Sequence, residues 1–99
     1  MWPIEEILID NMQSTKSAFE EFIASDYFNK LNDNSRQIII LELEVVKTNI
    51  DIFNEEMRRK GTIGEKDYGE LLADAFKAKD YLIKYQKKVI DELNNKGDD

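Results

Sequence analysis

The sequence contains no histidine and no cysteine. Histidine is the commonest general acid or base near neutral pH, and cysteine is a common nucleophile, so two of the usual catalytic side chains are absent. A disulfide framework is excluded too, although this alone does not fix the redox compartment. With one proline and four glycines among 99 residues, few residues interrupt regular structure, and long elements are expected.

Long hydrophobic runs are also missing. No apolar run approaches the ~20 residues of a membrane span, and residues 1–6 lack the basic and apolar regions of a signal peptide. We therefore expect a cytoplasmic protein that does not enter a membrane. The composition is that of a globular chain, with 35% charged and 41% apolar residues.

Basic residues are too few for broad binding to nucleic acid. The formal net charge is −7, from 14 basic and 21 acidic residues, and the acidic surplus lies in residues 1–56. Duplex nucleic acid is bound through an excess of lysine and arginine, so this class of ligand is not expected. The acidic half could instead attract a basic partner.

What the sequence does contain is helical periodicity. Residues 3–24 predict an amphipathic helix that opens at Pro3, and residues 25–31 predict a short helical corner. In the first helix the expected buried stripe consists of apolar residues about one turn apart: Ile4, Leu8, Met12, Phe19 and Phe22, with Ile7 and Ile23 beside them.

A second helix is predicted from near Asn34, which with Gln37 resembles a capping box, to the cations before Gly61. Its seam alternates spacings of four and three: Ile39, Leu43, Val46, Ile50, Phe53 and Met57. A second apolar row lies beside this seam: Ile38, Leu41, Val45 and Ile52. One neighbouring helix cannot cover both rows, so this helix is either central in the fold, with the first helix also packed on it, or contributes to a second interface. We assign the second row to an oligomer interface.

A third helix is predicted from after Gly64 to Asn94. Its seam has the same alternation: Leu71, Ala75, Ala78, Leu82, Tyr85 and Val89. Further apolar residues widen this surface: Tyr68, Leu72, Phe76, Ile83, Ile90 and Leu93. At 1.5 Å per residue the second and third helices each measure on the order of 40 Å.

The predicted fold is therefore all-α. Three main helices form one domain over residues 1–94, in which a long antiparallel hairpin carries the packed N-terminal helix, and residues 95–99 form a frayed tail. Helices of this length favour an elongated shape and a homo-oligomer.

Candidate chemistry is sparse. Adjacent acids such as Glu5 and Glu6, or Glu55 and Glu56, diverge by about 100° on a helix, so we interpret them as solvated faces rather than catalytic dyads. No calcium-binding loop pattern occurs, and we assign neither a metal nor a cofactor.

A basic loop is the one candidate ligand site. Cationic and hydrogen-bonding residues cluster around Gly61 and Gly64: Arg58, Arg59, Lys60, Thr62, Lys66 and Tyr68. Backbone N–H groups at a helix start could bind a small phosphate ligand there. The alternative is a tight turn in which Arg58 and Lys60 merely cap the preceding helix.

A lysine row follows on the third helix, at Lys77, Lys84 and Lys88 with Lys87 nearby. We expect its members to be solvated and paired with acids one turn away: Asp74, Asp80 and Asp91. The alternative is an anion-lined groove at a subunit contact.

Residues 22–59 carry a family resemblance. The matching features begin with four apolar residues and one serine at and before the corner: Phe22, Ile23, Ser25, Phe28 and Leu31. A polar helix start follows at residues 32–35. The helix after it carries apolar residues at Leu41, Val45 and Ile52 and ends in basic residues. This order resembles small uncharacterised helical proteins encoded by tailed bacteriophages. Where that family often has a glutamine and a methionine, this chain has Glu44 and Lys47 nearby.

The resemblance implies a phage origin and carries over no catalytic residue. It suggests a non-enzymatic accessory protein that binds and inhibits a protein of the infected bacterial host, such as a component of immune defence. One alternative is an oligomeric sponge that sequesters a cyclic nucleotide, a small anionic signal, at the basic loop and lysine row. Another is a structural or assembly protein of a phage complex. An enzyme is the least favoured class.

Overall fold

The computed structural model describes residues 3–97, and the side chains of residues 3–94. These residues form helix α1 (Pro3–Ala24), the single 3-10 turn η1 (Phe28–Lys30), helix α2 (Asp33–Lys60) and helix α3 (Glu65–Gly97), with no strand among them. The predicted all-α fold of three main helices is confirmed.

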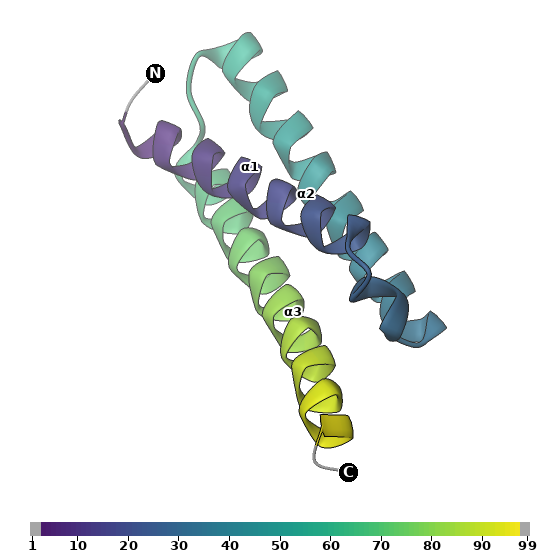
Figure 1. Ribbon diagram of the computed structural model, residues 1–99. Helices are drawn as coiled ribbons and strands as arrows, with labels where there is room; N and C mark the ends of the chain where they lie inside the picture. The colour runs from purple at the N-terminus through teal and green to yellow at the C-terminus, as the bar shows by residue number, and fades with distance from the viewer. Residues whose placement is uncertain (1–2, 98–99) are drawn as a thin grey trace.

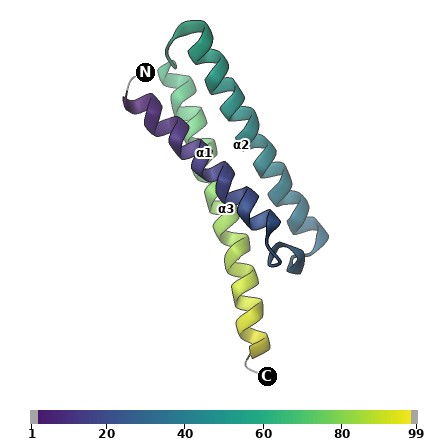
Figure 2. The ribbon, with the colours of Figure 1, turned by 45° about the horizontal axis from the view of Figure 1, so that its top comes forward.

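The helices form an elongated bundle that measures 58 × 21 × 19 Å. Helices α2 and α3 run antiparallel on either side of a short loop, and α1 lies across both of them (Figure 1). The C-terminal end of α3 extends beyond α1 and η1 (Figure 2).

The helix ends follow local chemistry with two corrections. Helix α2 is capped by Asn32, whose Oδ1 accepts from the Ser35 N–H at 2.8 Å, and the predicted capping box at Asn34 is wrong. At the other end, Gly61 adopts a left-handed φ of 75° and donates its N–H to the Met57 carbonyl. Helix α3 continues three residues past the predicted end at Asn94, and residues 98–99 of the predicted tail lie outside the described chain.

The core is one cluster to which each of the three α-helices contributes most of its predicted buried residues. Its larger members come from α1, α2 and α3 and include Leu8, Phe19, Ile39, Phe53, Leu82 and Val89. In α1 the prediction is wrong at two positions, because Ile4 and Ile7 are exposed. The position between them, Glu5, is buried instead.

Polar side chains join the helices at two levels. Asn49 of α2 donates from Nδ2 to Oδ2 of Asp74 on α3 at 3.0 Å, and Lys79 of α3 donates to Asn11 of α1. Asp74 is therefore bonded to the neighbouring helix rather than to the lysine row. These bridges fix the register in which the three seams meet.

Candidate interaction surface

The α2 row, defined as Ile38, Leu41, Val45 and Ile52, is exposed along its whole length. Spacings of three, four and seven place these side chains on the side of α2 that faces away from its buried seam. Leu41 is 63% exposed and Val45 is 42% exposed. A solvated helix face is normally polar, so four large aliphatic side chains in one row form a surface suited to another helix.

A second exposed row lies on α3. We define the α3 row as Phe76, Ile83 and Ile90, which recur every seven residues and are 52%, 60% and 56% exposed. The sequence pattern predicted these residues only as a widening of the buried surface of the third helix. The missed signal was their spacing of seven, offset by one residue from the seam at Ala75, Leu82 and Val89.

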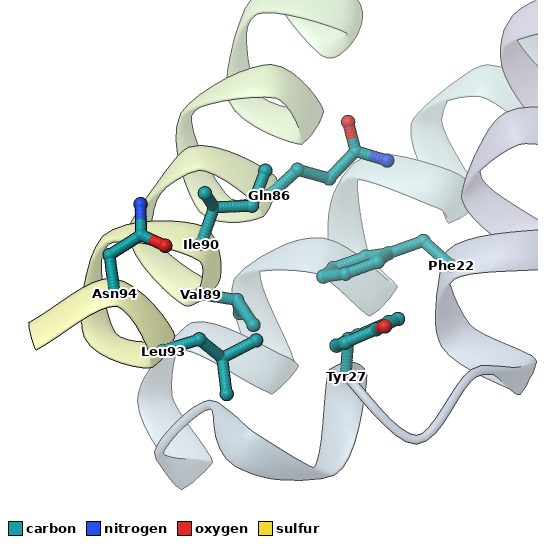
Figure 3. Close-up of a pocket in the computed structure, with 7 residues that line it drawn as sticks. All are labelled: Phe22, Tyr27, Gln86, Val89, Ile90, Leu93 and Asn94. Atoms are coloured by element: carbon teal, nitrogen blue, oxygen red, sulfur yellow. The ribbon is translucent and has the colours of Figure 1, made fainter. Parts of the chain in front are cut away.

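The α3 row ends in an apolar groove of about 420 Å³ between the end of α1, the corner and the last turns of α3. Phe22 and Tyr27 face the α3 side chains across it (Figure 3). The α3 side of the groove is formed by five residues: Gln86, Val89, Ile90, Leu93 and Asn94. Apart from two amides and the Tyr27 hydroxyl, the lining is apolar, which favours binding of apolar side chains over chemistry.

The corner that carries Tyr27 is held by aromatic packing. The Phe22 and Phe28 rings meet edge to face, with centroids 5.9 Å apart and planes at 82°. Ser25 directly follows α1, and its Oγ donates a hydrogen bond to the Phe22 carbonyl at 2.6 Å. This arrangement leaves the Tyr27 side chain exposed above the groove.

The basic loop is largely neutralised by neighbouring acids of α2. Arg58 pairs with Glu55 at 2.5 Å, while Arg59 and Lys60 pair with Glu56 at 2.6 and 3.1 Å. Hydrogen bonds from Lys60 and then Arg59 lower the pKa of the Glu56 carboxyl below its ordinary value. The three cations are therefore committed to helix-surface ion pairs.

Two of the six residues predicted as an anion site lie beside acidic side chains. Thr62 and Tyr68 line one pocket together with Glu5 and Glu65. Lys66 is the second residue of α3, is exposed, and lies outside that lining. Two carboxylates at this position oppose a phosphate ligand electrostatically.

The sequence pattern predicted Glu5 on a solvated face of α1, and this prediction is wrong. Glu5 is 2% exposed, and its Oε2 accepts from the Ile63 N–H at 2.7 Å, which ties the start of α1 to the loop between α2 and α3. The available signal was its position: Glu5 lies three residues before Leu8 and seven before Met12, on the buried face. It acts as a polar anchor of the loop.

Within the part of the chain that the structure describes, no group of three or more acidic side chains is placed to hold a metal ion. None of the helices in that part combines the length and hydropathy of a membrane span. Comparisons of this chain with protein-family models, with curated proteins and with solved structures found no match. The surfaces themselves therefore provide the evidence about function.

Proposed function

We propose that this chain is a non-enzymatic interaction protein that binds another protein through the α2 row and blocks it. The observation that carries the proposal is the exposed row itself: Ile38, Leu41, Val45 and Ile52. Covering such a row with a helix removes apolar area from water at a gain of about 25 cal/mol per Å². The row has the spacing that helix–helix seams require.

Charge narrows the class of partner. Acidic residues lie on both sides of the α2 row, at Glu42, Glu44 and Asp51. Among the described side chains, only Glu44 of these three forms an ion pair, with Lys47 at 3.6 Å. A helix with an apolar stripe and basic flanks fits this surface best. Because residues 22–59 resemble phage-encoded proteins, we infer that the partner is a protein of a bacterial host, with immune defence as the expected setting.

The cyclic-nucleotide sponge is supported by one observation. Lys77, Lys84, Lys87 and Lys88 form no ion pair within the described chain. A phosphate ligand would therefore bind along α3 rather than at the loop, where the cations are neutralised. Calorimetry with cyclic di- and trinucleotides, followed by heating to release the intact ligand, tests this alternative.

The protein-binding proposal is tested by an affinity pull-down from bacterial lysate with matched variants. Val45→Asp and Ile52→Asp place a charge in the α2 row, where these side chains are 42% and 44% exposed, whereas Ile7→Asp places one at an isoleucine of α1 that is 60% exposed. We expect a stoichiometric partner with the unmodified protein and with Ile7→Asp, and its loss with both row variants. Equal recovery from all variants, each with an unchanged helical spectrum, would refute the proposal.

A further inference from the structure

The two exposed rows of this molecule match in length. Ile38, Val45 and Ile52 on α2 and Phe76, Ile83 and Ile90 on α3 both recur every seven residues. Each row therefore spans about 21 Å of helix at 1.5 Å per residue. A spacing of seven keeps side chains on one side of a helix over this distance, as paired helices require.

The flanks of the two rows carry opposite charge. Over the length of each row, residues 38–52 contain three acids and one lysine, while residues 76–90 contain five lysines and one aspartate. On α2 the carboxylates of Glu42 and Asp51 form no ion pair within the described chain, and on α3 the same holds for Lys84 and Lys87. Both sets of charges are thus available to an incoming surface.

The same charges oppose the pairing of like rows. Two α2 rows brought together would place Glu42, Glu44 and Asp51 of each copy near those of the other, and two α3 rows would gather lysines. Like charges across a helix pair are destabilising, whereas opposite charges select the partner. The favourable combination is therefore one α2 row with one α3 row.

We propose that the α2 row binds the α3 row of a second copy of this chain. This inference rests on the proposed function, because the α2 row is the same site, and self-binding would compete with the host partner for it. A contact between unlike surfaces is heterologous, so its repetition gives a ring or an open chain unless two contacts close a pair. In the absence of the host partner, the α2 row would then be covered by the α3 row of another copy.

Cysteine crosslinking tests the pairing directly, because the natural chain has no cysteine to interfere. Two single variants, Val45→Cys and Ile83→Cys, one carrying a size tag, are mixed and oxidised mildly. We expect the mixed disulfide to exceed both like-with-like products several-fold. The control is Asn54→Cys with Ile83→Cys, since Asn54 is exposed on the side of α2 about 180° from Val45 and should give little product.

Charge reversal provides a second readout by sedimentation. Lys84→Glu with Lys87→Glu on α3, or Glu42→Lys with Asp51→Lys on α2, should each weaken self-association on the order of tenfold. A mixture of the two reversed proteins should recover the lost affinity between unlike copies. Failure of the mixture to recover it, with both variants folded, would overturn the pairing.

The outcomes also separate this inference from the proposed function. A protein that stays at 11.6 kDa in sedimentation, or a dominant disulfide between two copies of Val45→Cys, would overturn the α2–α3 pairing. Loss of the lysate partner from Val45→Asp would stand in either case. Conversely, confirmed self-association with no partner that depends on the α2 row would sustain this inference and refute the proposed function.

Discussion

Glu5 shows how a single carboxylate can serve packing rather than chemistry. Its Oε2 supplies the acceptor for the Ile63 N–H, a group that lies in the loop and outside any helical ladder. A buried N–H without an acceptor costs about 1–3 kcal/mol. The Glu5 carboxylate is buried where it supplies the hydrogen-bond acceptor that the loop backbone needs.

Replacing Glu5 with alanine should therefore lower the free energy of unfolding by about 2 kcal/mol, because the Ile63 N–H loses its acceptor. Glu6→Ala is the matched control: Glu6 is exposed in the same first turn, and we expect a change within about 0.5 kcal/mol. Urea unfolding followed by circular dichroism measures both. Equal effects of the two substitutions would show that Glu5 acts only through the charge of the helix start.

Glu56 leads to a prediction about acid. Because the Lys60 and Arg59 hydrogen bonds lower the pKa of its carboxyl in the folded state, its contribution to stability is present above the unfolded-state pKa. That contribution is lost as pH falls through the lower folded-state value. NMR titration should place the Glu56 carboxyl below the ordinary glutamate range and show its pKa rising in Lys60→Ala; an unchanged value would contradict the ion pairing.

At the scale of elements, two glycines make opposite demands. Gly61 follows the end of α2 and has a φ of 75°, a backbone angle that residues other than glycine rarely adopt. Nothing lies within 4 Å of a Cβ added there. Gly69 lies within α3, also with open space around an added Cβ. One position needs glycine for its backbone, and the other only weakens a helix.

Gly61→Ala should therefore destabilise the fold by about 1 kcal/mol, and Gly69→Ala should stabilise it by about 0.5–1 kcal/mol. The same chemical change is made in both variants, so the sign isolates the backbone conformation. Thermal unfolding of the two proteins side by side provides the measurement. Stabilisation by both substitutions would mean that the loop can end α2 without a left-handed residue.

The elements could largely be predicted from the sequence because a 3.6-residue period directly encodes the buried seam. Ile39 and Leu43 are buried for this reason. The pattern misplaced Ile4 and Ile7, because the position that faces the loop must satisfy an N–H that lies 58 residues away, and periodicity does not contain that demand. The sequence also could not show which of several consecutive capping residues begins α2, because each of them can act as an N-cap. In the structure the backbone is extended at Leu31 and Asn32, so Asn32 is the N-cap.

The candidate sites were predicted unevenly for similar reasons. The α2 row stood out because it exceeds what one neighbour can cover. The basic loop was overestimated, since the acids that neutralise Arg58 and Arg59 lie three residues earlier on the same helix, within reach in any helical arrangement. The spacing of seven marks the α3 row in the sequence, but the exposure of the row could be established only from the fold, in which Ile83 is 60% exposed.

At the scale of the whole molecule, the radius of gyration is 16.0 Å. A compact domain of this length has a radius of about 13 Å. The excess follows from long helices that share one narrow core, which leaves a large area of helix surface per residue. Such a shape combines a single cooperative core with long exposed rows.

Two isoleucines of α2 separate these roles. Ile50→Asp should unfold the molecule, because an unpaired charge in the shared core costs several kcal/mol. Ile52→Asp, two residues away on the exposed α2 row, should leave the helical spectrum and the melting transition nearly unchanged. Far-ultraviolet circular dichroism distinguishes them; a folded Ile50→Asp would place that side chain outside the core.

The tie between Glu5 and Ile63 also sets the order in which a growing chain can be completed. Helix α1 leaves the ribosome before α2 and α3, yet the group that anchors α1 is synthesised 58 residues later, and most of α3, on which α1 also packs, later still. The apolar side of α1, with Leu8, Met12 and Phe19, must therefore remain without its final neighbours while translation proceeds. Of the three helices, α1 is therefore synthesised before both of the helices that bury it.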